Sequence, residues 1–333
     1  MLSSASESFA SEDKYERRLS DAVVSKSAGY AAILTCAVLL GMWATVGTVA
    51  LATIPPLIVA VFVQAVGSAT FAPSLRRLSL TRQQWKLTIL AAVAGAFLAP
   101  LAYFVGLSRT TPPDAALLSN TEAMFTVVLA VVILGERLPR RGYAAVAAIL
   151  GGAVIVTLDV QAGGDFATRV IGDLLLVLAA ALWALDNTVS RIVTADHDIR
   201  AYSCIKLGLG SILLGVTALA LGQPLAIPPS SLPVMLFLGL TGSALFTFLF
   251  FSAMRGIGAL RAGAILGTSA VWGVAIAVAA GFPPPTPLQL AGGAIMVVAV
   301  LALYLQPHAE GPPHPTAPEV PGRSPPPVRQ KDN

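Results

Sequence analysis

Three ionisable residues, Glu122, Asp186 and Lys206, lie inside long apolar stretches of the chain. A charged group at the centre of a membrane helix costs roughly 2.5–3.5 kcal/mol on insertion scales, so each of the three needs a physical reason. Carboxylates in such a setting serve as proton sites, ligand sites or halves of an ion pair. These residues are therefore the first candidates for function.

Glu122 follows Pro113 by nine residues, which places it about 13 Å along a helix that starts at that proline. This depth is close to the midplane of a hydrocarbon core roughly 30 Å thick. Ser119, Glu122 and Thr126 share one face of that helix. The pattern predicts a substrate-binding face or a proton site, and the structural alternative is a carboxyl that bonds to a neighbouring helix.

Asp186 precedes Arg191 by five residues, and Lys206 follows Arg200 by six. Both side chains are then about 7–9 Å from the same interface on consecutive antiparallel helices, which predicts an ion pair. The pair either fixes the two helices together or rearranges to open a polar site on the cytoplasmic side. Lys206 alone can instead extend its ammonium group to the interface.

Polar and aromatic side chains extend these faces. Trp183, Asp186, Asn187 and Ser190 fall on one side of a helix, which favours a polar cavity there. The further cavity-lining candidates are aromatic: Trp43, Tyr103 and Trp272. Pro100 is expected to kink its helix, and Asp173 is expected to be solvated near the opposite interface.

The elements that carry these residues are apolar runs without charge. The chain of 333 residues is 56% hydrophobic and 11% charged, against about 25% charged in soluble domains. Residues 27–75, 87–108, 207–254 and 262–309 contain no Asp, Glu, Lys or Arg, and proline pairs break the longest runs. Ten spans are predicted: 29–52, 57–74, 88–108, 115–134, 143–159, 171–190, 201–221, 233–253, 260–281 and 288–306.

The basic residues alternate with these spans. All but three of the 21 Lys and Arg residues fall on the side of the N-terminus; Arg109 and Arg169 fall on the other side, and Lys206 lies within a span. This asymmetry places both termini in the cytoplasm and the chain in the cytoplasmic (inner) membrane.

An odd number of spans in each half inverts the second half relative to the first. We predict a polar N-terminal tail (1–27), a first repeat (28–159), an extracytoplasmic linker (160–170), a second repeat (171–306) and a proline-rich C-terminal tail (307–333). An offset of 147 aligns Ala115, Thr121, Ala123 and Phe125 with Ala262, Thr268, Ala270 and Trp272. The fold class is thus an all-α integral membrane protein of ten helices in two inverted five-helix repeats, and such repeats place the substrate between the halves.

Several stretches resemble the EamA-type branch of the drug/metabolite transporter superfamily. They are Ala99-Pro100-Leu101 to Gly106-Leu107-Ser108-Arg109, Ala116 to Thr126, Gly135-Glu136-Arg137-Leu138, Trp183-Ala184-Leu185-Asp186-Asn187 and Ile205-Lys206-Leu207-Gly208. Where family members often carry a Gly-Glu pair after the ninth span, Gly281 is followed by Phe282 and prolines, which argues against a symmetric role for Glu136. The resemblance implies a secondary carrier that works by alternating access, and it implies no particular substrate.

Other function classes find little support in the sequence. All three histidines, His197, His308 and His314, lie outside the spans, and no G-x-x-x-x-G-K-[ST] motif is present, so we expect neither an intramembrane enzyme nor an ATP-driven pump. The basic residues share no long face, which argues against nucleic acid. No cofactor or metal is expected. The predicted partners are a small-molecule substrate, the lipid bilayer and possible protons; a homodimer, a channel and a membrane scaffold or sensor remain alternatives.

Overall fold

The computed structural model describes residues 2–77, 80–134, 139–160, 165–194, 197–257 and 259–304, and these ranges contain helices and no strand. The first half of the described chain comprises α1 (Leu2–Leu51), α2 (Pro56–Phe71), η1 (Ala72–Arg77), α3 (Arg82–Ala91), η2 (Ala92–Leu98), α4 (Ala99–Leu107), α5 (Pro112–Leu118), α6 (Thr121–Leu134) and α7 (Arg140–Thr157). The second half comprises α8 (Phe166–Thr194), α9 (Ile199–Ala220), η3 (Pro229–Ser231), α10 (Leu232–Gly239), η4 (Leu240–Leu245), α11 (Phe246–Ile257), α12 (Ala259–Leu266), α13 (Ser269–Ala279) and α14 (Pro287–Tyr304). The segment with Glu136, the centre of the predicted linker and the C-terminal tail lie outside these ranges.

Nine helical stretches of the described chain are long and apolar enough to cross a membrane. They are Lys26–Leu51, Pro56–Leu75, Arg82–Leu107, Pro112–Ile133, Arg140–Thr157, Phe166–Thr194, Ile199–Ala220, Arg261–Ala279 and Pro287–Tyr304. The remaining predicted span, 233–253, coincides with consecutive α10, η4 and α11, where a shorter apolar stretch runs over Pro229–Gly242. The predicted all-α class with ten spans is confirmed.

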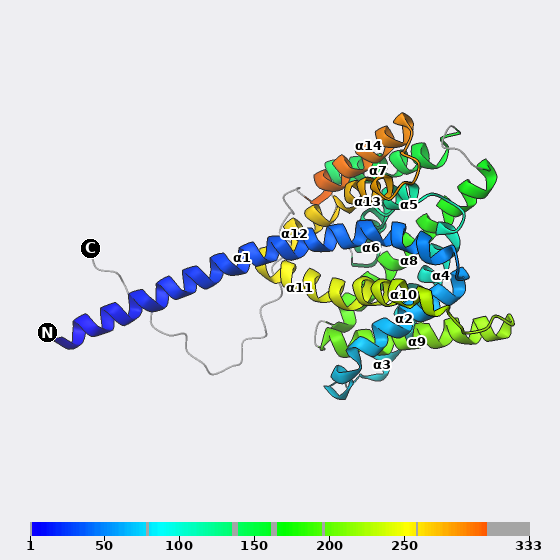
Figure 1. Ribbon diagram of the computed structural model, residues 1–333. Helices are drawn as coiled ribbons and strands as arrows, with labels where there is room; N and C mark the ends of the chain where they lie inside the picture. The colour runs from blue at the N-terminus through cyan, green and yellow to red at the C-terminus, as the bar shows by residue number, and fades with distance from the viewer. Residues whose placement is uncertain are drawn as a thin grey trace.

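The helices pack in a pattern that treats the two halves alike (Figure 1). The second spans of the two halves, α2 and α9, pack on each other, and so do the fifth, α7 and α14. The first span of one half packs on the third and fourth of the other: α1 contacts α11, α12 and α13, while α8 contacts α3, α4 and α6. Such exchange of partners is what a pseudo-two-fold axis between inverted repeats requires.

The helix breaks repeat as well. The third and eighth spans each contain a π-helical turn, η2 and η4, and these begin 148 positions apart, at Ala92 and Leu240. The fourth and ninth spans are each interrupted by a turn. The fourth is divided into α5 and α6, and the ninth into α12 and α13. At the breaks Thr121 donates to the carbonyl of Leu118 (2.7 Å) and Thr268 to that of Ile265 (2.6 Å), so equivalent hydroxyls satisfy equivalent carbonyls.

Glycines let the backbones of the two halves touch. A Cβ on Gly152 of α7 would lie 2.6 Å from the carbonyl oxygen of Gly292 on α14, and one on Gly106 of α4 would lie 2.7 Å from that of Gly172 on α8. Small residues at such crossings replace the hydrophobic driving force that helices lack in lipid. The contact between the halves is therefore close at both crossings.

Candidate functional site

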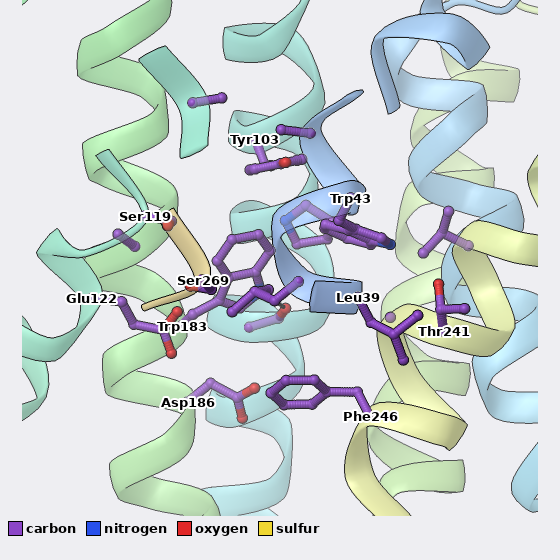
Figure 2. A pocket seen from close by; sticks show the side chains of 18 of the residues that line it. Leu39, Trp43, Tyr103, Ser119, Glu122, Trp183, Asp186, Thr241, Phe246 and Ser269 are labelled. Atoms are coloured by element: carbon purple, nitrogen blue, oxygen red, sulfur yellow. Dashed lines mark hydrogen bonds between the residues drawn. The ribbon is translucent and has the colours of Figure 1, made fainter. Parts of the chain in front are cut away.

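A cavity of about 240 Å³ lies between the two halves (Figure 2). Its walls come from α1, α2, η2, α4, α5 and α6 of the first half and from α8, α9, η4, α11 and α13 of the second. The polar and aromatic residues that line it are Trp43, Gln64, Tyr103, Ser119, Glu122, Trp183, Asp186, Asn187, Ser203, Lys206, Thr241, Phe246 and Ser269. Eight of the eleven residues that the sequence singled out for a binding face or cavity are among them, although their roles stay predictions.

Pro100 shapes one wall of the cavity. Because proline has no N–H, the carbonyls of Ala96 and Gly95, four and five residues earlier, lose the donor that a helix would supply. Gln64 of α2 donates to the Ala96 carbonyl at 2.8 Å, and Trp183 of α8 donates to the Gly95 carbonyl at 3.2 Å. The predicted distortion at Pro100 thus takes the form of the π-helical turn η2, held open by side chains from both halves.

Asp186 and Lys206 form the predicted ion pair. The Lys206 Nζ atom lies 2.6 Å from Asp186 Oδ2, and both side chains are largely buried, with 14% and 6% exposed. Ser190 donates to the other carboxylate oxygen of Asp186 at 2.8 Å, and the Ser190 hydroxyl lies 2.9 Å from that of Tyr202. Both members of the pair line the cavity, so the pair fixes α8 to α9 and also presents polar groups to whatever fills the space.

Glu122 approaches the same wall from the first half. Its Oε1 atom accepts a hydrogen bond of 2.8 Å from Nδ2 of Asn187 on α8. Glu122 lies in the first turn of α6, directly after the break, and Ser119 lies in the break itself rather than within a helix. Figure 2 shows Glu122 and Asp186 at the same end of the cavity. The bond to Asn187 agrees with the structural alternative for Glu122, while the cavity position agrees with the functional one.

Three aromatic rings lie against one another in the wall of the cavity. The ring centroids of Trp43 and Tyr103 are 5.1 Å apart, those of Tyr103 and Trp183 are 5.3 Å apart, and those of Trp43 and Trp183 are 6.2 Å apart. The Trp43 indole also donates to the carbonyl of Leu238, in the eighth span. The Trp183 indole donates in the same way to the carbonyl of Gly95, in the third span. The first helix of each half therefore closes on the third span of the other through a tryptophan.

Three of the predicted residues, Thr126, Ser190 and Trp272, are absent from the cavity lining. Trp272 is 41% exposed and lies outside the cavity lining, and its role in the site stays a prediction. Thr126 is one turn beyond Glu122, and it is also absent from the lining.

The sequence analysis missed a second polar cluster, at the end of the bundle opposite Asp186 and Lys206. It contains Asp114 of α5, Arg169 and Asp173 of α8, and Asp159 after α7, all at most 3% exposed. Asp173 was expected to be solvated, and that expectation is wrong. The available signal was the spacing of Arg169 and Asp173, which are one turn apart on a helix and can therefore pair. This spacing does not distinguish a buried pair from an exposed one.

No group of metal-binding side chains occurs in the part of the chain that the structure describes.

Just outside the spans, Asp165 caps the start of α8 by accepting a bond of 2.9 Å from the Thr168 N–H. The bonds from the hydroxyl and the N–H of Thr168 hold the pKa of Asp165 below its usual value.

Comparison with known proteins decides the family. A model of the EamA-like transporter family matches the chain twice, over residues 27–158 and 170–305. The chain belongs to the EamA-like transporter family. It is 26% identical over 299 residues to an uncharacterized transporter of Methanothermobacter thermautotrophicus, covering 83% of this chain and 86% of that protein. It is 23% identical over 222 residues to the uncharacterized transporter YyaM of Bacillus subtilis, covering 64% and 71%.

A solved crystal structure shares the EamA-type fold of this chain. Its TM-score is 0.59 at 22% identity, and the match covers 84% of this chain and 96% of that one. With two family units and its apolar helices, the chain is a multi-pass protein of a prokaryotic-type inner membrane. The predicted resemblance, fold class and membrane location are confirmed, whereas the exact limits of the repeats, linker and tails stay predictions.

Proposed function

We propose that this EamA-family transporter is a secondary carrier that moves a small metabolite, an amino-acid-like solute or a drug by alternating access. The observation that carries the proposal is the cavity between the inverted halves, since both halves supply its walls and the breaks in the third, fourth, eighth and ninth spans lie beside it. Rocking of one half against the other would expose such a cavity to one side at a time.

The charged groups of the cavity suggest how the solute binds. Asp186 and Lys206 offer both signs of charge, so an amino-acid-like zwitterion can insert between them and satisfy each group. The aromatic rings of Trp43, Tyr103 and Trp183 would cover the apolar part of the solute. Glu122 has no basic partner among the residues lining the cavity, and we assign it to proton exchange that drives export. We assign no catalytic role to any residue.

Counterflow in proteoliposomes tests this function. Purified protein is first screened by thermal shift against amino acids, polyamines, nucleosides, sugars, organic acids and cationic drugs at pH 6 and 7.5. A ligand at 100 times its dissociation constant adds about 2.7 kcal/mol of stability, which such a screen detects. We expect vesicles preloaded with the ligand that binds to accelerate entry of the same labelled ligand. Entry without acceleration would indicate a channel, and a folded protein without ligand or flux would favour a scaffold or sensor.

A further inference from the structure

The second polar cluster joins the two halves at the end of the bundle that the charge distribution places outside. Four of its hydrogen bonds run from residues of the second half to residues of the first. Gln289 of α14 donates to Asp114 Oδ1 at 2.5 Å, and Thr286 donates to Asp159. The Arg169 guanidinium donates to the carbonyls of Val156 (3.4 Å) and Asp159 at the end of α7. We call this cluster, Thr110, Asp114, Asp159, Arg169, Asp173, Thr286 and Gln289, the outer clasp.

In the outer clasp, Asp114 and Asp173 share one neighbouring cation, Arg169. Arg169 Nη1 lies 3.8 Å from Asp114 Oδ2 and 3.7 Å from Asp173 Oδ2, so neither carboxyl has a charged partner at hydrogen-bond distance. The hydrogen bonds of the guanidinium go to backbone carbonyls instead. Both carboxyl side chains are fully buried, and Asp173 Oδ2 and Arg169 Nε have no hydrogen-bond partner. A buried carboxylate in this condition is relieved by binding a proton.

The hydroxyl of Thr110 lies between the two carboxyls, Asp114 and Asp173, that could share a proton. Thr110 Oγ1 lies 2.6 Å from Asp173 Oδ1 and 3.2 Å from Asp114 Oδ2. A hydroxyl carries one hydrogen, so it can donate to only one of two ionised carboxylates. Both contacts are hydrogen bonds if one of the carboxyls is protonated and donates to Thr110 while Thr110 donates to the other. The proton then belongs to the pair of carboxyls rather than to either residue.

The charged groups around Asp173 come from every neighbouring element. Asp114 faces it from α5, Asp159 adds a further carboxyl after α7, and Arg169 lies one turn earlier on α8. Arg109, after α4, lies against Gly172 but is exposed to solvent at the rim. The neutral side chains of Thr110 and Thr157 complete the surroundings of Asp173. Two carboxyls thus lie beside one buried guanidinium, and a third, that of Asp159, lies near Asp114.

We propose that the outer clasp is a proton-binding site outside the cavity, at which one proton shared by Asp114 and Asp173 holds the two halves closed. Loss of this proton leaves two facing carboxylates, and their repulsion separates α5 from α8. Raising the external pH therefore favours opening of the cavity to the outside. This proton site is separate from Glu122. Its role in opening the cavity rests on the proposed carrier function, whereas the argument for the site itself rests on the contacts of the outer clasp.

Cysteine labelling tests the proposal without any substrate. Ala180 lines the cavity two turns along α8 from Asp173, on the same face, so a reagent must pass the outer clasp to reach it from outside. Ala180→Cys is made in a background without Cys36 and Cys204 and is labelled by a membrane-impermeant maleimide. Val160→Cys, 76% exposed beyond α7, is the matched control. Labelling of Val160→Cys corrects for the change in thiol reactivity with pH. Whether the reagent labels it in intact cells or in inside-out vesicles shows on which side of the membrane the outer clasp lies.

We expect the ratio of Ala180→Cys to Val160→Cys labelling to rise from pH 6 to pH 8 by on the order of fivefold or more, the lower end of usual coupling between sites. Asp173→Asn, whose amide mimics the protonated carboxyl, should keep the ratio low at both pH values. Thr110→Val, which removes the hydroxyl between the carboxyls, should raise the ratio at pH 6. A ratio independent of pH in the unmodified clasp, or a ratio raised at both pH values by Asp173→Asn, would overturn the proposal. Either result can occur with transport intact, so it is distinguishable from failure of the carrier function.

Discussion

At the scale of single residues, the ionisable groups of the cavity differ in what they bond to. Asp186 has both carboxylate oxygens occupied, one by Lys206 and one by Ser190. Glu122 accepts its side-chain hydrogen bond from the neutral amide of Asn187. A carboxyl with a neutral donor gains less from its negative charge than one paired with an ammonium group. Proton exchange therefore fits Glu122 better than Asp186.

Replacement of Glu122 by glutamine should uncouple transport from pH or abolish it. Glutamine keeps an oxygen that can accept from Asn187, so the fold and the expression level should be unchanged, while the proton site is gone. Counterflow and pH-driven flux at pH 6 and 7.5 measure the effect. Asp165→Asn is the matched control, because Asp165 is an exposed carboxyl outside the spans and should leave the pH profile unchanged. A normal pH profile in Glu122→Gln would remove Glu122 as the proton site.

The ion pair predicts a non-additive cycle of mutations. Asp186→Asn or Lys206→Met alone leaves one buried charge without its partner, which is strongly destabilising. The double change removes both charges and should be more stable than either single change, with a coupling energy of about 1–3 kcal/mol. Thermal unfolding in detergent measures the four variants. Losses that simply add would show that the 2.6 Å contact does not couple the two residues.

The sequence predicts some of these residues better than others. Counting residues from basic helix ends placed Asp186 and Lys206 at equal depth, and this sufficed because flanking Arg191 and Arg200 mark the interface. The sequence could not fix the direction of Trp272, because an apolar helix can face lipid or protein on any side. The residues of the outer clasp were missed because Asp114, Asp159 and Asp173 lie near span ends, where a charge is normally solvated.

At the scale of elements, breaks in helices build the cavity walls. In the turn η2, the carbonyls of Gly95 and Ala96 accept hydrogen bonds from side chains of other helices. The donors are Trp183 of α8 and Gln64 of α2, so these two bonds depend on where α8 and α2 lie. A backbone that is satisfied by side chains can exchange partners without breaking a continuous helix. Such irregular backbone is tolerated at membrane depth only where it faces protein or a cavity.

Gly95→Ala tests the fit between η2 and α8. A Cβ at position 95 would overlap the carboxyl group of Asp186, which must then move away from Lys206. Overpacking of this kind costs about 1–3 kcal/mol, and we expect a lower melting temperature together with weaker solute binding. Gly151→Ala is the matched control, since a Cβ there meets no atom within 4 Å. Equal stability and binding in the two variants would contradict the close contact between Gly95 and Asp186.

Spans are easier to predict than their breaks. Charge-free runs and proline pairs mark the spans because lipid excludes charge over a fixed thickness. Pro100 indicated a distortion in the third span. The fourth and ninth spans break at Ser119–Asn120 and at Gly267–Thr268, with no proline at either break to distinguish them from continuous helices. The agreement of breaks at an offset near 147 follows from tertiary packing in both repeats.

At the scale of the whole molecule, two of the contacts that join the halves at the outer end are made by polar side chains. One is the outer clasp. The other joins Thr53, after α1, to Ser231 of η3, whose hydroxyl oxygens lie 3.1 Å apart. Alternating access requires such contacts to separate when the cavity opens to the outside. A channel or a scaffold has no need for them to separate.

A reversible bond between Thr53→Cys and Ser231→Cys distinguishes these cases. Both changes are made without Cys36 and Cys204, and the pair is oxidised in proteoliposomes and then reduced. Because a disulfide would hold the halves together at one end, we expect oxidation to reduce counterflow at least about tenfold, with recovery on reduction and with solute binding from the other side retained. The single variant Thr53→Cys, treated identically, controls for damage by the oxidant. Full counterflow by the cross-linked protein would mean that the solute crosses without separation of the halves at this contact. The rocking of the halves would then have to be abandoned, even though the cavity between them remained the site of binding.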